Sequence, residues 1–84
     1  MGKLRNIGPK SSRWLEAVGV RNLEDLEQLG VVETFLRVRD AGFTTSLNLL
    51  WALQGAVMDI HWSELPPELK EELRLQVGSA DARS

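Results

Sequence analysis

Residues 47–58, LNLLWALQGAVM, are the longest strongly apolar stretch of this chain. Such a segment leaves almost no polar face when it is wound into a helix, and a helix that is apolar nearly all round is buried on several sides. The segment contains Asn48 and Gln54, and it is too short to span a bilayer. We therefore expect the central helix of a small domain here, capped by Thr45 or Ser46.

Glycine, proline and asparagine mark the limits of the other helices on either side of this segment. Pro9, near the first helical position, and the Pro66-Pro67 pair are typical helix starts. Asn22 is typical of an N-cap, and Asp25 three residues on is a variant of the capping box. The expected helices cover about residues 9–18, 23–29, 31–41 and 67–77, and the glycines that end them are Gly19, Gly30, Gly42 and Gly78. No stretch alternates long enough to predict a strand, so the fold class is all-α, a compact bundle of about five short helices.

Length and composition limit what this bundle can be. The chain has 84 residues, of which 43% are hydrophobic and 26% charged, which is typical of one soluble globular domain. We expect that domain at residues 1–78, with a frayed tail at 79–84. The chain has no cysteine and a single histidine, His61, so we expect no disulfide, no metal site and no cofactor. The start of the chain lacks the apolar core of a signal peptide, which predicts a cytoplasmic protein without a membrane partner.

The net charge of −2 conceals an uneven distribution of charged residues along the chain. Residues 1–21 carry five basic residues against Glu16 alone, whereas residues 22–84 carry the other five against eleven acidic ones. An acidic total argues against a dedicated nucleic-acid binder. The basic first quarter weakens that objection, because one face can be basic while the whole is not.

The basic residues 1–21 contain a motif that indicates a binding function, Asn6-Ile7-Gly8-Pro9-Lys10-Ser11. The first amides of a helix have no partner within the helix, and its dipole places positive charge there, so this start is a potential anion site. The expected phosphate ligands are Lys3, Arg5, Gly8, Lys10, Ser11 and Arg13. The competing interpretation of Gly8-Pro9-Lys10 is a helix start that serves turn geometry alone. For Arg13 and Arg21, the competing interpretation is that their charges are solvated on the helix surface.

Residues 7–26, IGPKSSRWLEAVGVRNLEDL, resemble the helix-hairpin-helix motif, in which a glycine-rich hairpin presents backbone amides and a lysine to DNA phosphates. The usual first helix of that motif would have to lie before Leu4. The resemblance implies a helix-hairpin-helix-like N-terminal half for the bundle.

A wider resemblance covers about residues 4–75. The segments LRNIGPKS (4–11), VETFLRVRDAG (32–42), SLNLLWALQGAVMDIHW (46–62) and ELPPELKEEL (64–73) are similar to the C-terminal domain of the TfoX (also called Sxy) family of bacterial competence regulators. The resemblance implies an all-helical fold, a role in switching on DNA-uptake genes, and a transcription-related partner. It implies no catalytic residues.

These observations favour a small non-enzymatic regulator that touches the DNA backbone weakly and without reading sequence, helped by a homodimer partner or a second protein. The alternative is a protein-interaction module with no nucleic-acid contact, docking through Val31 and Val38 or through Leu75. An enzyme ranks third, because no nucleophile–base pair or metal-ligand cluster is visible. We expect the three tryptophans to be mostly core, His61 to satisfy a backbone carbonyl in a turn, and Asn48 to pin a neighbouring turn.

Overall fold

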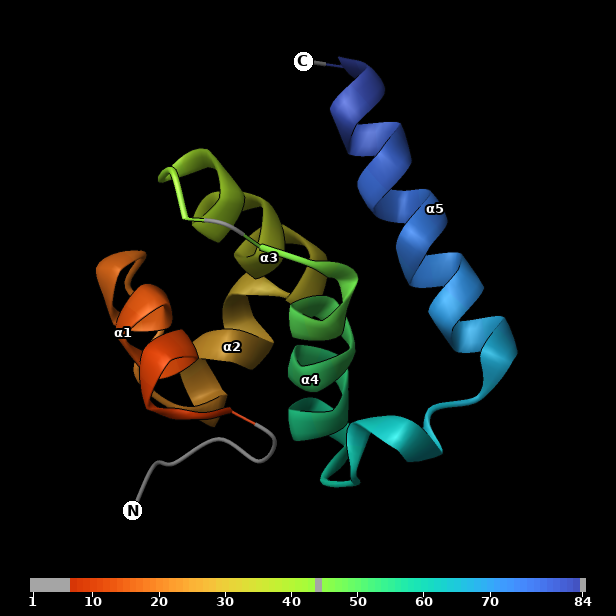
Figure 1. Ribbon diagram of the computed structural model, residues 1–84, viewed down its shortest axis with the longest axis horizontal. Coiled ribbons are helices and arrows are strands. Elements are labelled where there is room, and N and C mark those ends of the chain that lie inside the picture. The colour runs from red at the N-terminus through yellow and green to blue at the C-terminus, as the bar shows by residue number, and fades with distance from the viewer. Residues whose placement is uncertain (1–6, 44, 84) are drawn as a thin grey trace.

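The computed structural model describes residues 7–43 and 45–83, and every structural statement below refers to these residues. They form an all-α bundle, as predicted (Figure 1). Its helices are α1 (Pro9–Ala17), α2 (Leu23–Leu29), α3 (Val31–Asp40), α4 (Leu47–Met58) and α5 (Pro67–Arg83), with a short 3-10 helix η1 (Trp62–Glu64) before α5. The predicted limits of the first four helices are confirmed to within about one residue.

Local signals account for the N-terminal pair of helices. α1 begins with Pro9 at its first position, where the missing N–H breaks no intrahelical bond. The Asn22 side chain accepts a hydrogen bond of 2.8 Å from the Asp25 amide, which confirms it as the cap of α2. The Asp25 carboxylate reaches back to the Arg21 amide at 3.1 Å, one residue before the cap. Both bonds hold the chain at the start of α2.

A single residue, Gly30, joins α2 to α3. Its amide donates to the Leu26 carbonyl at 2.8 Å and its own carbonyl accepts from the Thr34 amide at 2.9 Å, so it ends one helix and begins the next. Its φ of +95° and ψ of 149° lie in a region open almost exclusively to glycine. This residue fixes the angle at which α2 meets α3.

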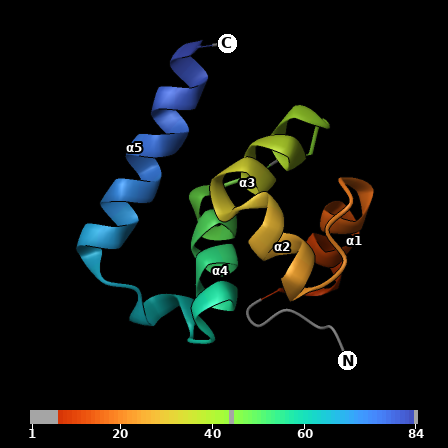
Figure 2. The same ribbon diagram turned by 180° about the vertical axis from the view of Figure 1, so that it is seen from behind.

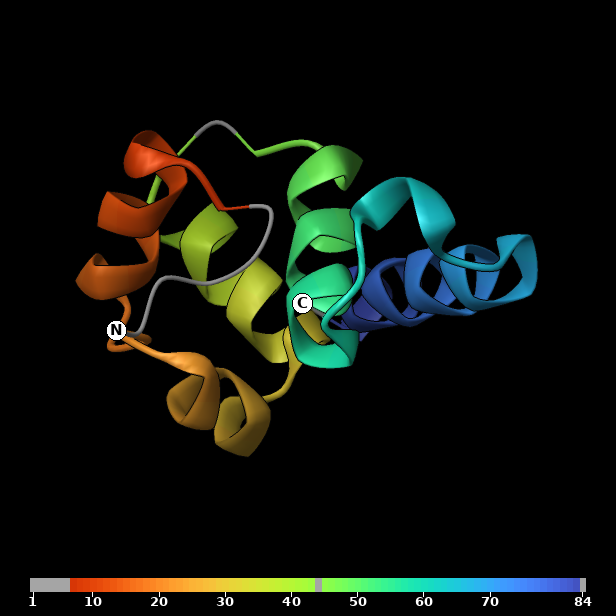
Figure 3. The same cartoon turned by 90° about the horizontal axis from the view of Figure 1, so that it is seen from below.

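Two helices, α3 and α4, form the centre of the molecule. The side chains of Leu50 and Leu53 on α4 are fully buried, and α4 contacts α2, α3, η1 and α5. Figure 3 shows α1 and α5 on opposite sides of it. The predicted central helix is confirmed. α3 is equally surrounded, since it contacts α1, α2, α4 and α5.

The residues of α3 that were expected to form a docking face are buried. Val31 and Val38 were predicted as that face, and this is wrong, because their exposed fractions are 9% and 0% and both belong to the core cluster. α3 contacts α1, α2, α4 and α5, so helices cover it on several sides.

The last helix flanks α3 and α4 and runs further than predicted (Figures 1 and 2). Leu73 and Val77 are buried and Leu69 packs partly against the same cluster, so the predicted apolar stripe is confirmed. The prediction that Gly78 ends this helix is wrong, since α5 continues to Arg83 and residues 79–83 are helical. A glycine ends a helix when its backbone adopts a positive φ. Gly78 has no positive φ. The sequence after it contains helix-forming alanines and no proline, so the helix continues.

Candidate nucleic-acid interface

The predicted phosphate ligands that the structure describes all lie at the start of α1. They are Gly8, Lys10, Ser11 and Arg13, and the other two, Lys3 and Arg5, lie outside the described residues. Gly8 caps the helix in an extended conformation, with φ −85° and ψ 177°. Its carbonyl accepts a hydrogen bond of 2.9 Å from the Ser12 amide. The predicted residues that the structure describes therefore belong to one helix start.

The backbone at this start is open to solvent. Gly8, Pro9 and Lys10 are exposed, and Ser11 is half-buried. A side-chain carbon added at Gly8 would meet no other atom within 4 Å. Among the described residues, no hydrogen-bond partner is found for the amides of Lys10 and Ser11. Two N–H groups at the positive end of a helix thus lack a partner among the described residues, which is the arrangement that binds an anion.

The cations near this start are not neutralised by neighbouring carboxylates. Within residues 7–43 and 45–83, neither Lys10 nor Arg13 forms a salt bridge, and the first turn of α1 has no acidic residue. Arg37 and Arg74, by contrast, are paired with Glu33 at 3.0 Å and with Glu71 at 2.6 Å. The two cations of α1 therefore keep their full charge for a ligand.

Trp14 fixes the position of Lys10. The lysine Nζ lies 5.5 Å from the centroid of the Trp14 ring, within the range of a cation–π contact. The same ring stacks on Phe43, with the two centroids 5.4 Å apart and the planes 20° from parallel. The ammonium consequently rests against α1 and does not project far ahead of the turn. A phosphate at the free amides would have to draw it off the ring.

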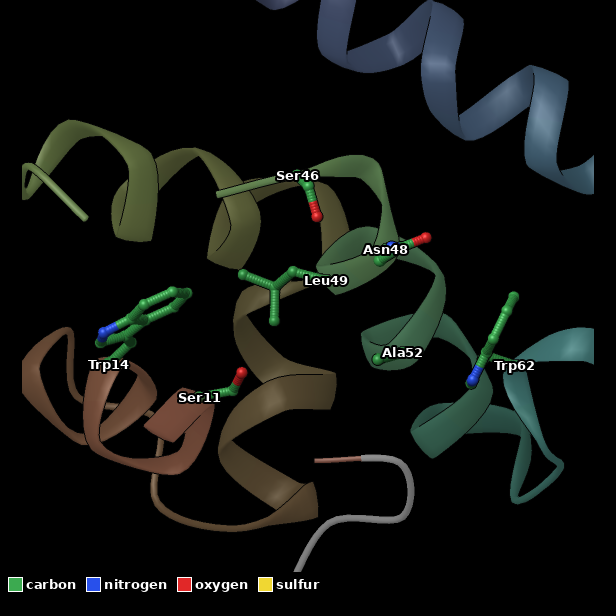
Figure 4. A pocket seen from close by; sticks show the side chains of 7 residues that line it. All are labelled: Ser11, Trp14, Ser46, Asn48, Leu49, Ala52 and Trp62. Carbon is green, nitrogen blue, oxygen red and sulfur yellow. The ribbon is translucent and has the colours of Figure 1, made fainter. Parts of the chain in front are cut away.

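A groove begins beside this turn and crosses one face of α4 (Figure 4). Its volume is about 360 Å³, and its lining residues come from α1, from the start of α4 and from η1: Ser11, Trp14, Ser46, Asn48, Leu49, Ala52 and Trp62. Ser11 belongs to both the helix start and the groove. The groove was not predicted from the sequence, although Asn48 was a signal for it, since a polar residue in an apolar helix either pairs with another polar group or lies at a surface. Its side chain is exposed at the groove, so it is not the predicted structural pin.

His61 is a cap of the 3-10 helix η1. Its Nδ1 accepts from the Ser63 amide at 3.2 Å and lies 2.7 Å from the Ser63 hydroxyl. The Glu64 carboxylate accepts from the His61 amide at 3.1 Å, which completes a capping box. The predicted turn role is confirmed, but the ring serves an amide and not a carbonyl. In the described part of the chain, His, Asp and Glu form no group of three that could hold a metal ion.

A family model of the TfoX C-terminal domain matches residues 1–77. The chain belongs to this family. Among curated proteins, TfoX1 of Aliivibrio fischeri, a "DNA transformation protein", is 29% identical over 75 residues. That alignment covers 88% of this chain but 36% of the relative, so the chain spans about a third of that relative's length.

Two crystal structures of Listeria monocytogenes proteins have the same fold as this TfoX C-terminal domain. A triclinic crystal form of an uncharacterised protein superposes with a TM-score of 0.84 at 32% identity, covering 94% of this chain and 90% of the other. A tetragonal form of a protein of unknown function gives a TM-score of 0.83 at 32% identity, covering 92% and 95%. Because these matches cover nearly the whole of each Listeria chain, the TfoX C-terminal fold also occurs in chains of about this length.

The search for a membrane-spanning helix gives a negative result for the part of the chain that the structure describes. None of its helices combines the length and the apolar character needed to cross a membrane.

Proposed function

We propose that this TfoX C-terminal domain is a small, non-enzymatic, cytoplasmic regulatory protein related to the competence regulators, and that it contacts DNA phosphates through the Gly8–Lys10 turn without reading sequence. The observation that carries this proposal is the open start of α1, where two amides without described partners lie beside Lys10 and Arg13, neither of which is paired with a carboxylate. The printed name of the Aliivibrio relative, a DNA transformation protein, supports a connection with DNA.

Each group at the turn has a definite role in this proposal. The amides of Lys10 and Ser11 donate hydrogen bonds to one phosphate, favoured by the helix dipole. Lys10 supplies a full positive charge, the Ser11 hydroxyl donates a further hydrogen bond, and Arg13 reaches a neighbouring phosphate. Contacts of this kind position a protein on DNA but carry no base information. Binding through so few groups is weak, so a second copy or a transcription-related protein has to assist it.

The described side chains support a non-enzymatic role. The contact between His61 and Ser63 has the residue types of a nucleophile and its base, yet Nδ1 faces the amide of the next turn and serves as a cap. Glu64 bonds to the His61 backbone and does not orient the ring. The pair therefore lacks the third group that would align a base for catalysis.

The test is a titration of fluorescently labelled duplex DNA at 50 and 200 mM salt. Neutralising about three to four phosphates makes affinity fall with roughly the third power of salt concentration, or about 60-fold between the two conditions. We expect Lys10→Glu to abolish measurable binding. Arg37→Glu makes the same charge change on α3, on a half-exposed side chain away from the turn, and should change affinity little. Absence of binding at 50 mM salt, or equal effects of the two substitutions, would contradict the proposal.

A protein-interaction module without nucleic-acid contact is the second candidate, and Leu75 favours it. This side chain on α5 has an exposed fraction of 59%, the largest among the exposed large apolar residues described. It lies in the acidic part of the chain, which repels DNA. A stable complex isolated from cells with the wild-type protein, and lost with Leu75→Glu, together with no DNA binding at low salt, would select this candidate.

A further inference from the structure

The groove on α4 has an aromatic ring at each end and a lysine at each ring. Figure 4 shows Trp14 and Trp62 on either side of Leu49 and Ala52, which are 7% and 8% exposed and form its floor. Lys10 Nζ lies 5.5 Å from the Trp14 centroid, and Lys70 Nζ lies 5.7 Å from the Trp62 centroid. The groove thus combines an apolar floor with two π-systems, and each ring is contacted by a lysine that is not itself a lining residue.

Neutral polar groups line the rest of the groove. Ser11, Ser46 and Asn48 form no side-chain hydrogen bonds with other described residues, and Ser46 caps α4 by position without bonding to an α4 amide. None of the lining residues is acidic. Glu64 follows Trp62 closely, but its carboxylate is occupied by the His61 amide. The lining residues therefore offer hydrogen-bonding groups to a ligand and add no carboxylate of their own.

The two tryptophans differ in how much ring they offer. Trp14 is already stacked on Phe43 and contacted by Lys10. Trp62 is 38% exposed at the far end. Lys70 contacts its ring at 5.7 Å from the centroid, but the His61 ring beside it is tilted by 33° at a centroid distance of 5.5 Å and is not stacked on it. Trp62 is therefore the ring on which an incoming planar group can stack.

A ligand that matches all of these features is anionic, planar and rich in hydrogen-bonding edges. Unpaired nucleotides have this chemistry, and proteins that bind single strands combine basic grooves with aromatic stacking platforms. A volume of about 360 Å³ suits a single base with its sugar and not a double helix. The bases of a duplex are stacked on each other, so their faces are not available to Trp62.

We propose that the α4 groove binds an unpaired base of single-stranded nucleic acid, stacked on Trp62, with Asn48 and Ser46 at its edge. Ser11 connects the groove to the start of α1, so a phosphate further along the same strand lies at the Gly8–Lys10 turn. The phosphate contact rests on the function proposed above, whereas the stacked base is a new element. The chain then prefers single strands to duplex.

The experiment compares a labelled oligo-dT with a duplex of equal length, by fluorescence anisotropy at 50 mM salt. We expect the wild-type protein to bind the single strand at least about tenfold more tightly, as one stacked base predicts. Trp62→Ala should remove that preference and leave duplex affinity unchanged. Trp62→Phe keeps an aromatic ring and should restore most of the preference for the single strand. This variant separates the loss of stacking from any loosening of η1. Leu75→Ala, a substitution of an exposed apolar residue outside the groove, is the matched control.

The outcomes distinguish the two proposals. Equal binding of single strand and duplex, weakened by Lys10→Glu but not by Trp62→Ala, overturns the groove proposal and leaves the phosphate contact intact. Loss of single-strand binding in Trp62→Ala without rescue by Trp62→Phe, in a variant whose helical circular dichroism is unchanged, also overturns stacking. Binding of neither nucleic acid overturns both proposals.

Discussion

Thr34 carries the one buried side-chain polar atom without a hydrogen-bond partner in the described part of the molecule. Its exposed fraction is 0%, and its Oγ1 finds neither donor nor acceptor. A buried hydroxyl in this state retains its desolvation cost, whereas a methyl group of the same shape has none. Thr34 lies on α3, which contacts helices on several sides.

We therefore expect Thr34→Val to stabilise the protein. The free energy of unfolding should rise by about 1 kcal/mol, which corresponds to an increase in Tm of roughly 4–8 °C for a domain of this size. Urea denaturation followed by circular dichroism measures the change. Thr45→Val makes the same replacement at a half-buried position and should change the free energy of unfolding by less than about 0.5 kcal/mol. A destabilised Thr34→Val variant would show that the hydroxyl has a partner after all.

At the scale of the elements, glycine has opposite roles at two positions. Gly30 joins α2 to α3 at φ +95°, and Gly78 lies within α5 without a positive φ. An added side-chain carbon meets no atom within 4 Å at either position. Steric crowding is therefore absent from both, and backbone conformation alone separates them.

Replacement by alanine should consequently change the free energy of unfolding in opposite directions at these two glycines. Gly30→Ala forces an L-residue into a strained conformation and should lower the free energy of unfolding by about 1–3 kcal/mol. Gly78→Ala replaces a poor helix former with the best one and should raise it by about 0.5–1 kcal/mol. Thermal and urea unfolding of the two variants test this pair. A shift in the same direction in both would refute the distinction.

The sequence predicted the first four helices because their limits depend on local chemistry. The Asn22 cap and the glycine stops act through neighbouring residues, so they are visible in a short window. The helix end predicted at Gly78 was wrong, since a glycine followed by helix formers need not end a helix. The groove was beyond local reasoning altogether, because Ser11, Asn48 and Trp62 meet only when α1, α4 and η1 pack together.

At the scale of the whole molecule, α5 is held to the body along one stripe. Leu73 and Val77 are buried against the core cluster, whereas Leu75, two positions after Leu73, faces solvent. Lys70 adds cation–π contacts from the same helix to Trp51 and Trp62, at 5.9 and 5.7 Å from the ring centroids. The attachment of the longest helix therefore depends on few side chains, in a domain whose total stability is of order 5–15 kcal/mol.

Leu73→Ala should accordingly destabilise the whole domain. Removing a buried leucine from a core costs about 2–5 kcal/mol, which is a large share of that total. Leu75→Ala deletes the same atoms two residues away, at an exposed position, and should change stability by less than about 0.5 kcal/mol. Urea titrations of both variants provide the comparison. If Leu73→Ala were as mild as Leu75→Ala, α5 would not be an integral part of the fold.

The placement of the three tryptophans supplies the protein with optical probes of its two sides. The chain contains no tyrosine, so its ultraviolet emission arises from Trp14, Trp51 and Trp62. Trp14, stacked on Phe43, reports on the attachment of α1, and the other two, next to Lys70, report on the attachment of α5. Chains that keep a single indole therefore follow the loosening of one flank at a time, without any added dye.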